Sequence, residues 1–129
     1  MSDCVLDTSA LLALLYGEPG HLVVSGFVTE TGARMSAVNL SEVLTRLPEI
    51  GVPERETAAA VERLNLRVVA FDEPQARATA LLRPVTRQAG LSLGDRACLA
   101  LGRARGCPVV TADRVWATVD IGVEIILIR

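Results

Sequence analysis

Short apolar segments alternate with longer helical patterns along the whole chain, and this alternation limits the fold of its 129 residues more than any other feature. We expect strands at residues 3–6, 34–37, 66–71, 108–111 and 123–128. We expect helices at residues 9–15, 20–31, 40–47, 53–65, 74–88, 93–105 and 114–118. Alternating strands and helices form mostly parallel sheets with right-handed crossovers. The sequence therefore predicts one α/β domain over residues 1–129, with a mostly parallel central sheet and helices on both faces.

Three prolines bear on the expected helix boundaries. Pro53 and Pro74 stand at predicted helix starts, where the missing N–H of proline costs nothing. Pro84 lies inside the helical pattern of residues 74–88, so we expect a kink or a break there.

The composition bears on the core and on the cellular compartment. Half of the residues are hydrophobic and only 3% are aromatic, so Leu, Val, Ile and Ala must build the core, as is typical of a sheet covered on both faces.

Cys4, Cys98 and Cys107 show no CxxC spacing, which favours buried reduced thiols over a disulfide or a zinc site. No segment approaches the roughly 20 apolar residues of a membrane-spanning helix, and no basic residue precedes the apolar residues 10–16. We expect a cytoplasmic protein with no membrane partner.

Four acidic residues stand where an apolar strand ends or where a helical pattern begins. Asp7 and Asp113 follow predicted strands, whereas Glu42 and Asp95 lie in the first turns of predicted helices. In an open α/β sheet, the carboxyl ends of the strands and the amino ends of the following helices line one edge, where such folds bind ligands. We therefore expect the four carboxylates to meet at this edge.

Each acid also has a purely structural explanation, because Asp and Glu in a first helical turn are stabilised by the helix dipole and by capping. The pairs Asn39 and Glu42, and Ser92 and Asp95, both have the spacing of capping boxes. Four carboxylates at one edge, however, would repel one another and raise each other's pKa unless a cation neutralised them. Ligands that are all oxygen suit Mg²⁺ or Mn²⁺ better than zinc.

The segments around these acids carry a family resemblance that covers the whole chain. Residues 5–11 (VLDTSAL), 39–43 (NLSEV), 93–101 (LGDRACLAL) and 110–116 (VTADRVW) together resemble the PIN-domain ribonucleases, in particular the VapC-type toxins of toxin–antitoxin pairs. Some members carry a further acid shortly after the fourth, where this chain has Arg114, Val115 and Trp116. The chain departs from the family there, which leaves open whether the site holds one metal ion or two.

The resemblance implies a metal-dependent endoribonuclease that hydrolyses phosphodiester bonds with Mg²⁺, or with Mn²⁺ in its place. It implies Asp7 and Asp95 as direct metal ligands, Asp113 as a direct or water-mediated ligand, and Glu42 as a ligand or as the group that orients the attacking water. It also implies supporting hydrogen bonds from neighbouring polar side chains, namely Ser9, Asn39 and Thr111, which otherwise are plain helix caps and strand ends.

The resemblance further implies an RNA substrate, a homodimer and a cognate antitoxin whose helix fills an apolar groove. The predicted helices at 9–15 and 20–31 carry apolar side chains beyond what one sheet face needs, namely Leu11, Leu12, Leu14, Leu15, Leu22, Val23, Phe27 and Val28. Core burial is the ordinary explanation for them, but part of this surface could be exposed and bind the antitoxin.

The charge balance is compatible with a nucleic-acid partner. The net charge is −2, but setting the four acids aside leaves a positive remainder, and bound divalent cations would add to it. All 13 basic residues are Arg, whose planar fork suits phosphate, although a genome rich in Arg codons explains this equally well.

Three single residues near the motifs have more than one interpretation. Arg96 follows a proposed ligand and could pair with an acid or with a phosphate. We expect Trp116 to pack in the core rather than to stack on a base, and His21, the only histidine, to be solvated.

Two other functional classes compete with the nuclease. A phosphoryl-transfer domain of the receiver or haloacid-dehalogenase type also places an Asp after its first strand. However, the dehalogenase pattern requires a second Asp where this chain has Ser9, and a receiver requires a Lys, which this chain lacks. A non-catalytic interaction module that retains the fold is disfavoured because all four acids are present.

Overall fold

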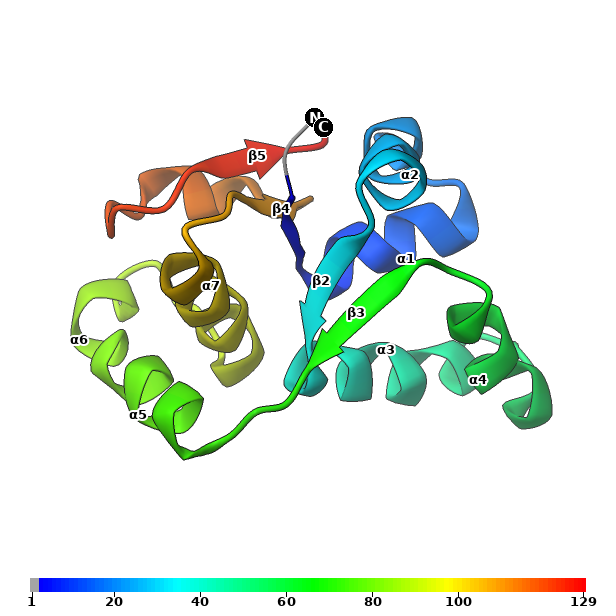
Figure 1. The fold of residues 1–129 in the computed structure, drawn as a ribbon, viewed down its shortest axis with the longest axis horizontal. Coiled ribbons are helices and arrows are strands. Elements are labelled where there is room, and N and C mark those ends of the chain that lie inside the picture. Colours follow the sequence, from blue (N-terminus) through cyan, green and yellow to red (C-terminus); the bar gives the residue numbers. More distant parts are fainter. Residues whose placement is uncertain (1–2) are drawn as a thin grey trace.

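A five-stranded, wholly parallel sheet runs through the centre of the molecule in a computed structural model that describes residues 3–129 (Figure 1). The strand order is β3-β2-β1-β4-β5, so the first strand lies in the middle of the sheet. The strands are β1 (Val5–Leu6), β2 (Ala33–Ser36), β3 (Leu66–Val69), β4 (Val109–Thr111) and β5 (Ile125–Leu127). This architecture confirms the predicted α/β class and the parallel sheet.

Within residues 3–129, seven α-helices and one 3₁₀ helix connect and cover these strands. They are α1 (Thr8–Tyr16), α2 (His21–Glu30), α3 (Ala37–Glu49), α4 (Glu54–Glu62), α5 (Glu73–Leu81), α6 (Arg83–Thr86), α7 (Leu93–Arg105) and the 3₁₀ helix η1 (Arg114–Thr118). The break expected at Pro84 is present, because α5 ends at Leu81 and Pro84 lies at the start of α6.

The helix α3 begins earlier than the sequence pattern predicts. The Oγ of Ser36 accepts a hydrogen bond from the backbone N–H of Val38 at 3.2 Å, so Ser36 is the N-cap and the helix starts at Ala37 rather than at residue 40. The capping box predicted for Asn39 and Glu42 is therefore wrong. Both residues lie inside the helix, and their side chains are free for other partners.

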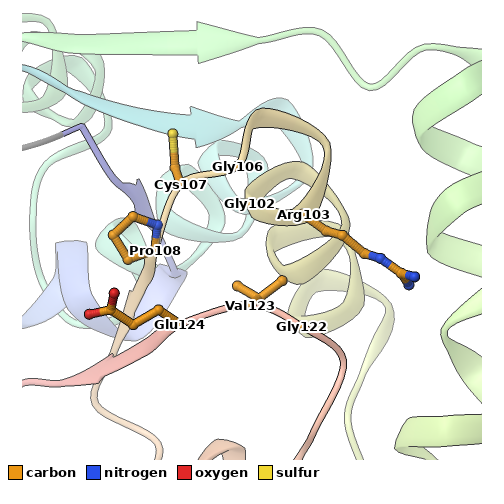
Figure 2. A pocket seen from close by; sticks show the side chains of 8 residues that line it. All are labelled: Gly102, Arg103, Gly106, Cys107, Pro108, Gly122, Val123 and Glu124. Atoms are coloured by element: carbon orange, nitrogen blue, oxygen red, sulfur yellow. The ribbon is translucent and has the colours of Figure 1, made fainter.

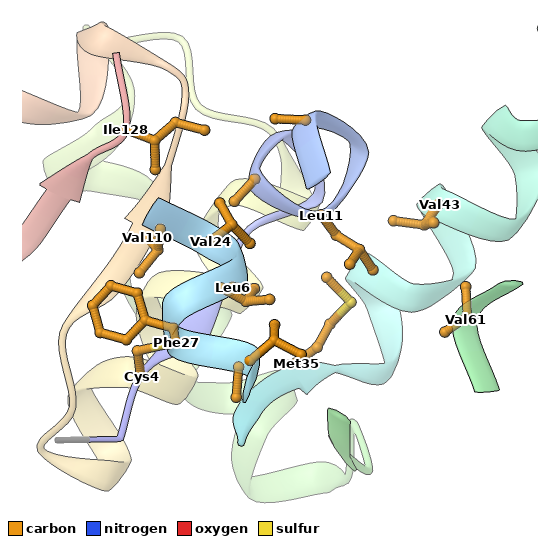
Figure 3. Packing of buried hydrophobic residues seen from close by; sticks show 14 of the residues in the cluster. Cys4, Leu6, Leu11, Val24, Phe27, Met35, Val43, Val61, Val110 and Ile128 are labelled. Atoms are coloured by element: carbon orange, nitrogen blue, oxygen red, sulfur yellow. The ribbon is translucent and has the colours of Figure 1, made fainter. Parts of the chain in front are cut away.

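Alternate residues of the central strands point into two separate cores. Leu6 and Val110 face a cluster formed with Met35 and the helices α1 to α4, which Figure 3 shows together with Leu11 and Phe27. Val5 and Val109 face the opposite cluster, which includes residues of α7, Leu82 between α5 and α6, and the fully buried Trp116 of η1. Figure 1 shows the same division, with α1 to α4 on one side and α5 to α7 on the other. Helices on both faces, and Trp116 in the core, were both predicted.

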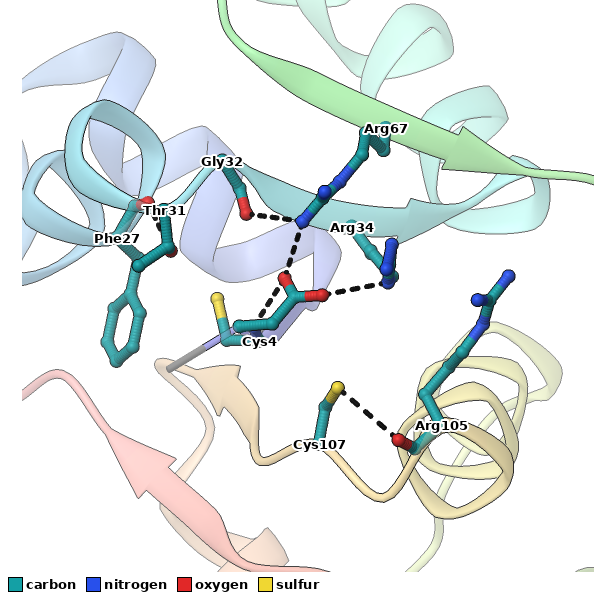
Figure 4. A network of polar contacts seen from close by, with 9 residues as sticks. Cys4, Phe27, Thr31, Gly32, Arg34, Arg67, Arg105 and Cys107 are labelled. Carbon is teal, nitrogen blue, oxygen red and sulfur yellow. Dashed lines mark hydrogen bonds and ion pairs between the residues drawn. The ribbon is translucent and has the colours of Figure 1, made fainter. Parts of the chain in front are cut away.

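The amino edge of the sheet is fastened by one acid and two arginines. Asp3 lies 2.9 Å from Arg34 and 3.0 Å from Arg67, and Arg67 also donates to the carbonyl of Gly32 (Figure 4). These ion pairs join the start of β1 to β2 and β3. They place the basic side chains of this edge away from the four acids, which follow the opposite ends of the strands.

The three cysteines are free thiols. Cys4 and Cys98 are buried as predicted, whereas Cys107 is only half-buried. Burial is the main cause that raises the pKa of Cys4 to about 12, so this thiol stays protonated at neutral pH.

No single helix among residues 3–129 has the length and apolar character needed to cross a membrane. The helices α1 and α2 meet these criteria only as a pair, and they are bent by 101° relative to each other.

Candidate active site

The four acids occupy the carboxyl edge of the sheet. Asp7 follows β1 and is the N-cap of α1, and Asp113 follows β4 and is the N-cap of η1. Glu42 lies in α3, which starts directly after β2, and Asp95 lies in the first turn of α7. Their charges act on one another: Asp95 raises the pKa of Asp7, and both Asp113 and Glu42 raise the pKa of Asp95. The fold thus places at one edge of the sheet four residues that are far apart in the sequence.

Asp7 is the most buried of these acids, with 3% of its surface exposed. Its Oδ2 accepts hydrogen bonds from Ser9 Oγ at 2.7 Å and from Thr111 Oγ1 at 2.8 Å. Burial raises the pKa of Asp7 to about 6, and the two hydroxyl donors counteract part of this rise. The same hydroxyls accept hydrogen bonds from the backbone of Ala112 and Asp113, which fixes the segment after β4 against β1.

Glu42 is held by two neighbouring side chains. Its Oε1 accepts hydrogen bonds from Thr8 Oγ1 at 2.5 Å and from Asn39 Nδ2 at 3.0 Å. Asn39 is fully buried, and its Nδ2 also lies 3.0 Å from the carbonyl oxygen of Gly94 in α7. The carboxylate of Glu42 therefore stands where α1, α3 and α7 meet.

Asp95 and Asp113 both cap helices in addition to lying at the acidic edge. Asp95 forms the predicted capping box of α7, in which Ser92 Oγ accepts from Asp95 N at 3.2 Å and Asp95 Oδ2 accepts from Ser92 N at 2.9 Å. Asp113 Oδ1 accepts from Val115 N at 3.1 Å. Burial is the main cause that raises the pKa of Asp95. Capping thus explains part of the positions of these two acids, but it does not neutralise their charge.

The chemistry of the donor atoms fits a hard divalent cation. In Glu42, Asp95 and Asp113, one carboxylate oxygen accepts hydrogen bonds from the protein, while the other accepts none from residues 3–129. None of the four acids forms an ion pair with a basic side chain in this part of the chain. Oxygen donors with uncompensated negative charge are the ligands that Mg²⁺ and Mn²⁺ prefer.

The side chains do not yet converge on one point. Within the described residues, no three His, Cys, Asp or Glu side chains stand close enough to hold a single ion. Glu42 is exposed and Asp95 is half-buried. Carboxylates at one edge repel one another unless a cation neutralises them.

Two residues differ from their expected roles. Arg96 forms no ion pair with an acid within residues 3–129; instead its Nη1 donates to the carbonyl of Thr79 at 3.1 Å and joins α7 to α5. His21 is half-buried at the start of α2 rather than fully solvated.

Thr8 and Gly94 are contacts of Glu42 that the sequence patterns did not single out. Gly94 could have been noticed in the sequence, because a glycine inside a helix is about 1 kcal/mol less favourable than alanine and usually has a packing or functional reason.

A hollow lies at the opposite edge of the sheet from the four acids. It has a volume of about 140 Å³ and is bordered by Cys107 and Pro108, which precede β4, together with Arg103, Val123, Glu124 and three glycines (Figure 2). The Arg103 side chain points away from it. Because Asp113 follows β4 and Pro108 precedes it, this hollow is not part of the acidic site.

The parallel sheet with four acids at its carboxyl edge defines a small α/β domain. Comparison with known proteins agrees: residues 4–122 match the family model of the PIN domain. The chain is 30% identical to Ribonuclease VapC of Mycolicibacterium smegmatis over 91% of its own length and 96% of the relative. It is 33% identical to Ribonuclease VapC42 of Mycobacterium tuberculosis over 91% of the chain and 95% of the relative. The chain therefore belongs to the PIN domain family and, by these relatives, to its VapC ribonucleases.

A solved structure supports the same fold. A DNA-bound VapBC complex from Salmonella typhimurium aligns over 100% of both chains with a TM-score of 0.78 and 22% identity. The predicted resemblance is thus confirmed, and the receiver and dehalogenase alternatives are excluded.

Proposed function

We propose that this chain is a divalent-metal-dependent endoribonuclease and the toxin of a type II toxin–antitoxin pair. The catalytic site for RNA cleavage in this proposal consists of Asp7, Glu42, Asp95 and Asp113. The observation that carries the proposal is the placement of four acids at the carboxyl edge of the sheet, none of which forms an ion pair with a basic side chain within residues 3–129. Mutual repulsion at such an edge weakens the fold unless a cation binds there. The relatives named above are ribonucleases, which makes RNA the substrate we infer.

The four acids have different tasks in this proposal. Asp7 and Asp95 hold the ion, and Asp113 completes the site directly or through water. A bound Mg²⁺ or Mn²⁺ would polarise the phosphate and lower the pKa of a bound water molecule, which makes that water a better nucleophile. Glu42 either joins the ligands or accepts a hydrogen bond from the attacking water, which it can do because one of its oxygens is free.

The supporting hydroxyls and amide keep these carboxylates in place. Ser9 and Thr111 both donate to Oδ2 of Asp7, which would leave its other oxygen as the ligand of an ion. They also favour the ionised form of Asp7 against the effect of burial. Asn39 and Thr8 hold Glu42 in place in the same way, by donating hydrogen bonds to its Oε1. Residues that orient metal ligands typically contribute about 10–100-fold in affinity or activity.

We infer an antitoxin as the partner that restrains this activity, as in the VapBC complexes that share the fold. The apolar surface of α1 and α2 is the docking site we favour, because Leu22 is 74% exposed and Val23 and Tyr16 are also exposed. Leu11, Phe27 and the other large side chains of these helices are buried or half-buried, so only part of the predicted surface is available. A homodimer and a cytoplasmic location belong to the same proposal.

Controlled expression tests the toxin role. Expression of the chain alone should arrest growth, Asp7→Asn should abolish the arrest, and sequencing of RNA ends should reveal new cleavage sites only with the unmodified chain. RNA cleavage without any growth defect would favour an RNA-processing nuclease. Absence of both cleavage and metal binding would favour a non-catalytic module that retains the fold.

A further inference from the structure

Gly94 stands against the carboxylate of Glu42. A Cβ atom at position 94 would lie 2.6 Å from Glu42 Cδ and closer still to both carboxylate oxygens. Gly94 is buried, and it lies in the first turn of α7 one residue before Asp95. Its φ is not in the left-handed region, so the backbone does not require a glycine here. The absence of a side chain makes space for the carboxylate instead.

Hydrogen bonds fix Glu42 in this space from the other side. Thr8 and Asn39 both donate to its Oε1, and the Asn39 amide at the same time donates to the carbonyl of Gly94. The amide thus connects the backbone of α7 directly to the carboxylate of α3. A Cβ atom added at position 94 would have to displace the carboxylate that these two donors hold.

We infer that Gly94 is a positioning residue for Glu42: the bare backbone of α7 forms the wall that sets where this carboxylate stands. The inference rests on the proposed function for its effect on metal binding, but the contact itself does not depend on it. A flexible carboxylate can move aside at little cost to folding. We therefore expect the Gly94→Ala variant to fold normally but to hold the Glu42 carboxylate in a different position. This combination separates a positioning role from a structural one.

Gly102 provides a matched control on the same helix. A Cβ atom there would lie 2.5 Å from Val109 Cγ1, a fully buried side chain of β4, and 3.2 Å from the carbonyl oxygen of Cys107. The core cannot move aside as Glu42 can, because its side chains are close-packed. Gly102→Ala should therefore lower the melting temperature and leave the acidic edge unchanged. Gly94→Ala should alter the acidic edge without lowering the melting temperature, whereas Gly102→Ala should do the reverse.

The experiment is a cycle of Gly94→Ala, Glu42→Ala and the double variant, with Gly102→Ala as control. Mn²⁺ affinity is measured by calorimetry, and the side-chain amide resonance of Asn39 is followed by NMR without metal. We expect Gly94→Ala to lower Mn²⁺ affinity by about 10–100-fold and to shift the Asn39 amide resonance. Neither change should occur when Gly94→Ala is introduced on the Glu42→Ala background, because no carboxylate is left to displace.

Two results separate this inference from the proposed function. If Gly94→Ala shifts the Asn39 resonance only when Glu42 is present, while Glu42→Ala leaves Mn²⁺ affinity unchanged, the positioning contact stands and the metal role of Glu42 fails. If Gly94→Ala leaves the Asn39 resonance unchanged, or shifts it equally on both backgrounds, Gly94 does not position Glu42 and the inference is overturned.

Discussion

The substitution Asp7→Asn should make the metal-free protein more stable at neutral pH. Asp7 is almost fully buried, and burial raises the pKa of its carboxyl group from 3.8 to about 6. Folding therefore disfavours the ionised form, and above pH 6 this penalty amounts to about 3 kcal/mol. An asparagine carries no charge and can still accept from Ser9 and Thr111. Because an amide is not identical to a protonated carboxyl group, we expect a gain of about 1–3 kcal/mol in the free energy of unfolding.

The pH dependence of this gain has a definite sign. The ionised form is disfavoured by folding, so the wild-type penalty is fully present above pH 6 and disappears as the pH falls toward 3.8. The stability difference between Asp7→Asn and wild type should therefore be largest above pH 6 and vanish near pH 4.

Denaturant unfolding in chelator at several pH values measures the difference directly. Glu62→Gln, which removes an exposed acid of α4, serves as the control and should change little. An Asp7→Asn protein that is less stable than wild type at pH 7.5 would refute the argument that burial and repulsion strain this site.

Two further predictions concern the ion and the partner. Chelation with EDTA should abolish RNA cleavage, Mg²⁺ or Mn²⁺ should restore it, and Ca²⁺ should support it poorly, since the site is built from oxygen ligands; full activity in chelator would remove the metal mechanism. Leu22→Glu should weaken antitoxin binding without unfolding the protein, because Leu22 is 74% exposed on α2, whereas Leu81→Glu, at 77% exposure on α5, should not. A co-purification assay in which Leu22→Glu binds at full affinity would exclude the α1–α2 surface.

The order of strands and helices could be predicted because each element carries its own pattern. The apolar runs that end at Leu6 and Thr111 are short and bounded, and Pro84 breaks a helix by its own geometry. The start of α3 could not be predicted as well, since Ser36 and Asn39 are both acceptable N-caps and the sequence alone does not choose between them. The choice follows from β2, which ends at Ser36 and leaves Asn39 buried.

The placement of the four acids at one edge was predictable from topology, and the family resemblance implied Ser9, Asn39 and Thr111 as hydrogen-bond partners, whereas the contacts of Thr8 and Gly94 were not predicted. Residues that follow parallel strands must lie at one edge, which is why Asp7 and Asp113 could be placed together. The contacts of Glu42 with Thr8 and Gly94 depend on how the helices α1, α3 and α7 pack against one another. A local sequence pattern does not predict this packing geometry. Arg96 shows the same limit, because its partner is a backbone carbonyl of α5.

Cleavage of a defined RNA by metal-stripped protein, with and without added Mg²⁺, tests the central claim most directly. The wild-type chain should cut only when the metal is present. Asp7→Asn, Glu42→Gln, Asp95→Asn and Asp113→Asn should each remain folded and lose more than about 100-fold in rate, since even residues that merely support metal ligands are worth about 10–100-fold. If any two of these variants cut RNA at the wild-type rate with Mg²⁺ present, the four-carboxylate site is wrong.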